Sequence, residues 1–143
     1  EGLAEAVKYS LIDSYGLLDF IEGNISEILN KEEKTLTKLI LRCAEIKAKI
    51  VSEDEREIKG IRTILNLGHT VGHGIEASSN YRISHGKAVG LGIIAALHIS
   101  KQTGILKDTK LTERIINLLT NIGLPSKIKL NKEKVLEAIK RDK

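Results

Sequence analysis

The segment from Ser84 to Thr103 constrains the fold more than any other, because it reads as a helix that is apolar on almost every side. Its apolar residues are Val89, Leu91, Ile93, Ile94, Ala95, Ala96 and Leu97. A helix without a broad polar face is buried, so we expect this one at the centre of the fold. Its glycines, Gly86, Gly90 and Gly92, would let neighbouring helices approach its backbone closely.

Apolar residues recur at helical spacing through most of the remaining sequence. They predict further amphipathic helices at about residues 3–12, 17–29, 32–53, 61–77, 108–122 and from 131 onward. The second of these is expected to break at Gly23-Asn24, and Gly123-Leu124-Pro125 is a strong helix stop. Residues 126–130 are the only short strand candidate. The sequence therefore predicts one all-α domain over residues 1–143, a bundle of about six to seven helices.

Composition excludes several classes of protein. Hydrophobic residues make up 41% of the chain and charged residues 29%, which is typical of a soluble globular protein. The net charge of +4 is too mild to indicate a nucleic-acid partner, and aromatic residues at 3% offer no stacking surface for single strands. No apolar run has the length of a membrane span, so no membrane partner is expected either.

The chain opens on Glu1 and contains no methionine, which indicates a piece of a longer protein. Its single cysteine fits a reducing compartment, and the expected location is the cytoplasm.

Histidines are concentrated in one short stretch. If residues 62–76 form a helix at 100° per residue, Arg62, Asn66, His69, His73 and Glu76 fall within an arc of roughly 80°. A third imidazole, His85, follows after a turn-like break at the start of the apolar helix. A stripe that combines a guanidinium, an amide, two imidazoles and a carboxylate is what a metal site beside an anionic substrate would need.

Two readings of the histidine pair remain open on the residues alone. His69 and His73 are four residues apart, the spacing that places two metal ligands on one helical face. The familiar zinc-protease motif with that spacing has a glutamate after the first histidine, whereas this chain has Thr70, so the general base of a protease is missing. The alternative is a pair of hydrogen-bonded histidines at the edge of the core, which is the commoner role for an isolated pair.

A catalytic zinc site of the His/Glu kind uses three protein ligands and keeps one position open. A carboxylate from elsewhere in the chain is therefore expected, and Glu5, flanked by apolar residues, is the best candidate. On spacing alone, a surface pair between Glu5 and Lys8 is favoured over a ligand role. The acidic run from Glu53 to Glu57 reads as a charged loop on its pattern alone.

Several segments, taken in order, carry a resemblance to a known family. They are Gly2–Tyr9, Glu45–Val51 with Asp54–Glu57, Leu65–Glu76 with His85–Val89, and the turn Gly123–Pro125. Their order and spacing resemble the C-terminal domain of 3-dehydroquinate synthase, within the sugar-phosphate cyclase superfamily, over residues 2–125. The chain departs from the family by a lengthened loop between Glu57 and Arg62 and by Lys87, where a glutamate is usual.

The resemblance implies an NAD- and metal-dependent phosphate lyase and cyclase. The family converts 3-deoxy-D-arabino-heptulosonate 7-phosphate to 3-dehydroquinate and phosphate, in the shikimate pathway of aromatic amino-acid biosynthesis. NAD⁺ transiently oxidises a ring hydroxyl that a divalent ion, Zn²⁺ or Co²⁺, holds. This chain shows neither a Gly-x-Gly-x-x-Gly turn nor a strand–helix alternation. The resemblance therefore implies that NAD is bound mainly by an N-terminal dinucleotide-binding domain absent from this chain, that the piece alone is inactive, and that the full-length form is a homodimer.

The resemblance also implies a role for individual residues. The metal ligands would be Glu5, His69 and His85. The catalytic residues would be Lys8, His73 and Asn66, of which His73 and Asn66 would also face the leaving phosphate. The substrate-binding residues would be Lys47 and Arg62 at the carboxylate, Glu57 in the same pocket, and Lys143 at the phosphate.

Two alternatives remain beside this interpretation. A sister sugar-phosphate cyclase would share the motifs but make another carbocycle, and the carboxylate-binding pair of Lys47 and Arg62 favours the synthase. A non-catalytic helical module would bind zinc at His69 and His73 and need no partner domain.

Overall fold

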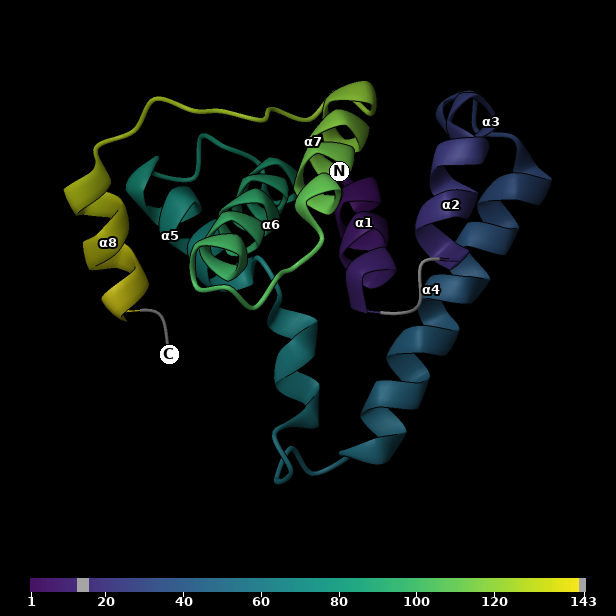
Figure 1. Cartoon of the computed structure of the whole chain (residues 1–143), viewed down its shortest axis with the longest axis horizontal. Helices are drawn as coiled ribbons and strands as arrows, with labels where there is room; N and C mark the ends of the chain where they lie inside the picture. The colour runs from purple at the N-terminus through teal and green to yellow at the C-terminus, as the bar shows by residue number, and fades with distance from the viewer. Residues whose placement is uncertain (13–15, 142–143) are drawn as a thin grey trace. The chain divides into compact units, whose positions relative to one another are not determined.

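The computed structural model describes residues 1–12 and 16–141, and every regular element in those ranges is helical (Figure 1). The elements are α1 (Gly2–Ile12), α2 (Gly16–Gly23), α3 (Ile25–Leu29), α4 (Glu33–Glu53), the 3₁₀ helix η1 (Ile61–Asn66), α5 (His69–Ser78), α6 (His85–Gln102), α7 (Thr109–Asn121) and α8 (Lys132–Arg141). The predicted all-α class is confirmed for this part of the chain. Residues 126–130 form no strand, so that candidate was wrong.

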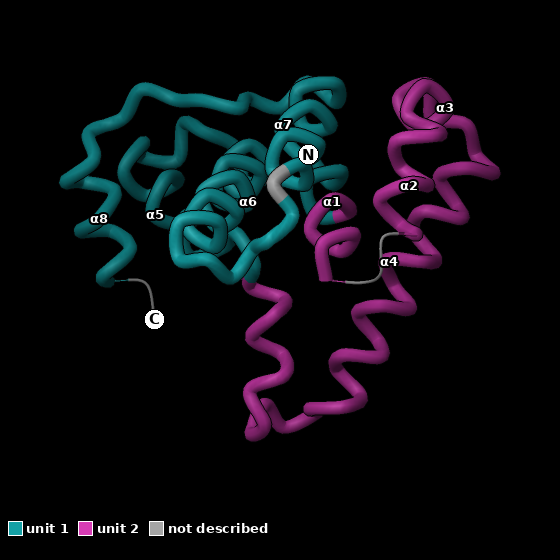
Figure 2. The backbone as a smooth tube through the Cα atoms, viewed as in Figure 1, with its two compact units in different colours: residues 1–5, 67–143 teal, residues 6–66 magenta. Residues whose placement is uncertain are grey.

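The chain divides into two compact units, which Figure 2 colours separately. The first consists of residues 1–5 and 67–143, and the second of residues 6–66. Helix α1 thus contributes its first turn to the first unit and its remainder to the second.

None of the described helices is long and apolar enough to cross a lipid bilayer.

Helix α6 is the centre of the first unit, as its all-round apolar sequence predicts. Ala88, Val89 and Ile93 have no exposed surface, and α6 packs against both α5 and α7. Helix α8 packs on α5, where Ile75 forms a small core with Ala88 and Leu91. The first residues of α5 and α6 are both histidines, so this packing also sets the distance between two candidate ligands.

Glycines allow the closest backbone contacts in this unit. A Cβ atom on Gly92 would collide with the carbonyl oxygen of Gly68 and would lie 3.0 Å from the backbone nitrogen of Gly72. A Cβ atom on Gly86 would lie 2.6 Å from the carbonyl oxygen of Glu1. The chain before α5 and the chain before α1 therefore both rest directly on α6, as expected for Gly92 and Gly86, whereas Gly90 has only ordinary side-chain contacts.

The second unit contains α2, α3, α4, η1 and most of α1. Leu17, Leu18 and Ile21 of α2 are buried, as are Leu39 and Ile50 of α4. The predicted break near Gly23-Asn24 is confirmed, because α2 ends at Gly23 and α3 begins at Ile25. The side-chain amide of Asn24 donates to the carbonyl oxygen of Phe20 at 2.8 Å, which satisfies one of the last carbonyls of α2.

The prediction of one helix over residues 61–77 is wrong. Residues Ile61–Asn66 form a 3₁₀ helix, and α5 begins only at His69. Between them Gly68 adopts a left-handed conformation with φ of 80°, which ends any continuous helix. The stripe expected to join Arg62 and Asn66 to the histidines on one helical face therefore does not exist.

The expected number of six to seven helices is also too low. The described residues form eight α-helices and one 3₁₀ helix. The additional elements come from the division at Gly23-Asn24 and from the division at Gly68.

Candidate metal centre and active site

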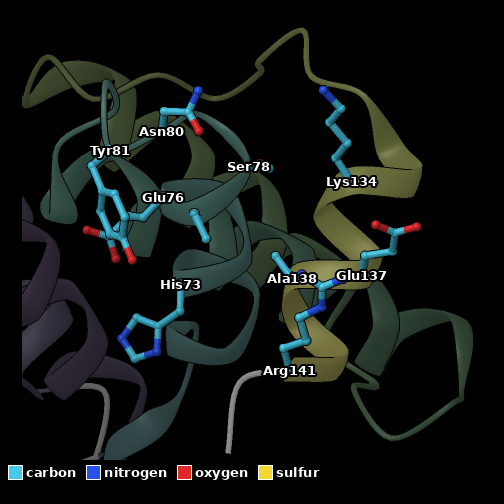
Figure 3. Close-up of a pocket in the computed structure, with 10 residues that line it drawn as sticks. His73, Glu76, Ser78, Asn80, Tyr81, Lys134, Glu137, Ala138 and Arg141 are labelled. Carbon is cyan, nitrogen blue, oxygen red and sulfur yellow. The ribbon is translucent and has the colours of Figure 1, made fainter.

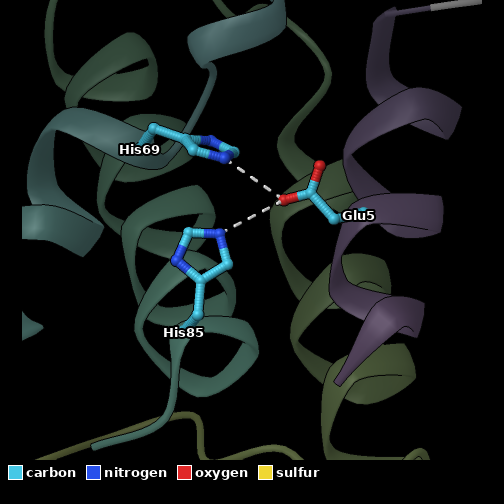
Figure 4. Close-up of side chains that lie close together, drawn as sticks. All are labelled: Glu5, His69 and His85. Carbon is cyan, nitrogen blue, oxygen red and sulfur yellow. Dashed lines mark ion pairs between the residues drawn. The ribbon is translucent and has the colours of Figure 1, made fainter. Parts of the chain in front are cut away.

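Glu5, His69 and His85 converge in the first unit, although they come from three different helices (Figure 4). Oε1 of Glu5 lies 3.2 Å from Nε2 of His69 and 3.9 Å from Nε2 of His85. The two imidazole centroids are 5.4 Å apart. The close contact of Glu1 with Gly86 brings the first turn of α1 beside the start of α6, which is how a residue so distant in sequence reaches the histidines.

Both imidazole rings direct Nε2 toward the carboxylate of Glu5. Nδ1 of His69 lies 3.3 Å from the carbonyl oxygen of Leu67, and Nδ1 of His85 lies 3.2 Å from Oε2 of Glu76. A ring that donates from Nδ1 leaves the lone pair of Nε2 for another partner. In metal-binding histidines one ring nitrogen faces the ion and the other donates to an oxygen acceptor. His69 and His85 have this arrangement, with Nε2 toward Glu5 and Nδ1 beside an oxygen atom.

This donor set fits a divalent metal. One ligand atom from each of the three residues lies within 4.8 Å of the others, which is close enough to surround a single ion. Two imidazole nitrogens and one carboxylate oxygen form the set that catalytic zinc uses when one position stays open for substrate. The structure thus brings together the three residues that the family resemblance implies, and their binding of an ion stays a prediction.

His73 lies at the edge of the same cluster, one turn after His69 on α5. Its ring centroid is 5.6 Å from that of His69 and 6.1 Å from that of His85. His73 and Glu76 also line a cavity of about 570 Å³ beside α8 (Figure 3). Two cationic side chains of α8, Lys134 and Arg141, line the cavity as well, so it combines both signs of charge.

A second group of site residues lies in the loop after α4 and at the start of η1. A terminal nitrogen of the Arg62 guanidinium lies 3.3 Å from the carbonyl oxygen of Glu55 and 3.8 Å from a carboxylate oxygen of Glu57. Within the described residues, the Nε–H group of Arg62 is buried and has no hydrogen-bond acceptor. Arg62 and Glu57, which the resemblance places in one pocket, are therefore neighbours in the second unit.

Asp54 organises this loop, a role that the sequence did not predict. Its buried carboxylate accepts the backbone N–H groups of Lys59 and Ile61, each at 2.9 Å, and that of Arg62 at 3.4 Å. The N–H group of Lys59, followed by those of Arg62, Ile61 and Ile58, lowers the pKa of Asp54 below its usual 3.8, and burial opposes this shift. An aspartate just after a helix end is a turn signal that could have identified it.

The remaining predicted residues occupy separate positions. Lys8 is buried in α1, with its ammonium group 5.0 Å from the centroid of the Tyr9 ring, whereas Lys47 on α4 and Asn66 at the end of η1 are exposed. All three belong to residues 6–66, while His73 belongs to the other unit. The shared phosphate role of Asn66 and His73 stays a prediction. Lys143 lies outside the described residues.

Comparison with known proteins identifies the family. Residues 2–143 match the family model described as 3-dehydroquinate synthase C-terminal. The chain belongs to this family. A relative named 3-dehydroquinate synthase from Thermoanaerobacter pseudethanolicus is 47% identical over 99% of the chain and 40% of its own length. One of the same name from Sulfolobus acidocaldarius is 36% identical over 100% of the chain and 42% of its own length.

The chain thus spans about two fifths of the length of these relatives. Family membership confirms the family resemblance seen in the sequence.

Proposed function

We propose that this chain is the metal- and substrate-binding part of a 3-dehydroquinate synthase, which converts 3-deoxy-D-arabino-heptulosonate 7-phosphate to 3-dehydroquinate and phosphate. The observation that carries the proposal is the convergence of Glu5, His69 and His85, with both Nε2 atoms directed at one carboxylate oxygen. Membership of the family and the names of the relatives support the choice of reaction.

Glu5, His69 and His85 would hold a divalent ion, Zn²⁺ or Co²⁺. The ion, when bound, supplies Lewis-acid polarisation of a substrate hydroxyl, and NAD⁺ supplies the hydride acceptor. His73, whose ring lies at the edge of the imidazole cluster, would hold or move a proton beside the ligands and would face the leaving phosphate together with Asn66. Lys8 would act as a further catalytic residue.

Arg62 and Lys47 would bind the substrate carboxylate. A guanidinium presents a planar fork of donors that matches the two oxygens of a carboxylate. The buried Nε–H group of Arg62, which has no acceptor in the described part of the chain, supports this role because a bound carboxylate would provide one. Glu57 lies beside the guanidinium and would hold it in place, and Lys143 would reach the phosphate.

NAD would be bound mainly by an N-terminal dinucleotide-binding domain outside these 143 residues. The relatives are more than twice as long as this chain, which leaves room for such a domain. We expect the chain alone to release no phosphate, because it would lack the hydride acceptor.

A sister sugar-phosphate cyclase is the second candidate, since it would use the same metal ligands. The arrangement of Arg62 argues for the synthase, because a substrate without a carboxylate would leave its buried Nε–H group without an acceptor.

The test is phosphate release by the full-length protein, supplied with NAD⁺ and Zn²⁺ and given either the heptulosonate phosphate or a heptulose 7-phosphate that lacks the carboxylate. The proposal predicts turnover of the first substrate only. Turnover of the second substrate alone would assign the protein to the sister cyclases.

A further inference from the structure

His85 differs from the other predicted ligands in how little surrounds it. Its side chain is 48% exposed, whereas that of His69 is 17% exposed. His85 is also the first residue of α6, where no preceding helical turn restricts its ring. Packing alone therefore does not hold this imidazole in the orientation that directs Nε2 at Glu5.

Glu76 supplies the missing constraint. Its carboxylate oxygen Oε2 lies 3.2 Å from Nδ1 of His85, and its side chain is only 14% exposed. We propose that Glu76 is a positioning residue of the metal centre, which orients the His85 ring and keeps the ring proton on Nδ1 so that the lone pair of Nε2 faces the ion. A carboxylate is the strongest available acceptor for this purpose, and such partners raise the basicity of a ligating imidazole.

Glu76 is itself held firmly. The backbone carbonyl oxygen of Glu76 accepts hydrogen bonds from the backbone N–H of Tyr81 and from the hydroxyl of Ser79, each at 2.8 Å, in the turn that ends α5. The backbone from which the carboxylate projects is thus fixed at the end of a packed helix. A positioning residue has to be rigid in this way if it is to orient a ligand.

The positioning role of Glu76 competes with a second ion site. Ligand atoms of His73, Glu76 and His85 also lie within 4.8 Å of one another. However, Nδ1 of His85 cannot donate a proton to Glu76 and also bind an ion. If Glu76 accepts this proton, each chain binds one ion, so the number of bound ions tests the proposed role.

The inference rests on the proposed metal site, and the experiment separates the two. In the full-length protein, the zinc dissociation constant is measured by competition with a chelator for Glu76→Ala, Glu76→Gln, His85→Ala and Glu113→Ala. Glu113 is an exposed carboxylate on α7 of the same unit and serves as the charge-matched control. Loss of zinc binding in His85→Ala tests the metal site itself, whatever Glu76 does.

We expect Glu76→Ala to weaken zinc binding roughly 10–100-fold, the range for a lost partner of a ligating histidine. Glu76→Gln keeps an acceptor oxygen and should lose less, and Glu113→Ala should bind as the parent does. In the apo protein, ¹⁵N NMR should place the His85 proton on Nδ1 in the parent, and Glu76→Ala should shift it toward Nε2. Unchanged zinc affinity in Glu76→Ala, or two ions bound to each parent chain, would overturn the inference. Equal losses in both Glu76 variants would do so as well.

Discussion

Gly92→Ala tests whether the close approach of the chain before α5 to α6 holds the first unit together. A Cβ atom at this position would collide with the carbonyl oxygen of Gly68 and would lie 2.9 Å from its carbonyl carbon. Because these are backbone atoms, no side-chain rotation relieves the contact. Gly90, two residues earlier on the same helix, is the matched control, since its Cβ atom would meet only side-chain atoms of Leu119 and Leu124 at 3.6 Å.

The magnitude follows from two opposing effects. Alanine is favoured over glycine inside a helix by up to about 1 kcal/mol. Overpacking costs about 1–3 kcal/mol, and a clash against backbone belongs at the upper end of that range. Gly92→Ala should therefore lower the free energy of unfolding by about 2 kcal/mol. Gly90→Ala, with ordinary contacts only, should raise it by up to about 1 kcal/mol.

Thermal unfolding followed by circular dichroism measures the difference. For a chain of this size, 1 kcal/mol corresponds to roughly 3–4 °C in Tm. We expect Gly92→Ala to melt about 6–8 °C below the parent and Gly90→Ala up to about 4 °C above it. If Gly92→Ala melts as high as Gly90→Ala, the backbone of Gly68 does not rest on α6 at this glycine and the account of the first unit is wrong.

Three further predictions concern η1, the loop before it and the proposed reaction. Arg62→Lys keeps the charge but loses the planar fork of the guanidinium. It should therefore lower kcat/KM of the full-length enzyme by an amount that corresponds to a loss of about 1.5–3 kcal/mol in transition-state stabilisation. Near-parental kinetics would remove Arg62 from the carboxylate site. Asp54→Asn should lower the free energy of unfolding in urea at neutral pH. Because the pKa of Asp54 is lowered in the folded state, its carboxylate contributes fully to the free energy of unfolding at pH values above 3.8. The difference in that free energy between Asp54→Asn and the parent should therefore shrink as the pH falls below 3.8. A difference that grows toward low pH would contradict the role of the backbone donors. The 143-residue chain alone, given substrate, NAD⁺ and Zn²⁺, should release no phosphate, and release without added NAD⁺ would show that the chemistry is a different one.

The fold could be predicted from the sequence wherever the pattern within one segment decided it. The segment around Val89 and Ile93 is apolar on all sides, and a buried central helix is the arrangement that removes all of those side chains from water. Gly68 shows where this reasoning stops. A single glycine is tolerated inside a helix, and only its contact with Gly92, 24 positions along the chain, identifies it as a break.

The candidate site was predictable only in part for the same reason. The spacing of His69 and His73 indicates a shared helical face, yet the pair that faces Glu5 is His69 and His85. Spacing alone favoured a surface pair for Glu5, because nothing local reveals that its helix reaches the start of α6. The family resemblance supplied this assignment. Asp54 escaped notice because its pattern is that of a charged loop, and its burial depends on the backbone of residues that follow it.

The zinc content of three purified full-length variants tests the central claim most directly. The account predicts that His69→Ala and His85→Ala lose zinc, whereas His73→Ala, which removes a neighbouring imidazole and no proposed ligand, retains it. Emission spectrometry of the purified proteins, with circular dichroism to confirm that each variant is folded, gives the answer. Full retention of zinc in His85→Ala together with its loss in His73→Ala would contradict the account and favour a non-catalytic zinc module built on His69 and His73.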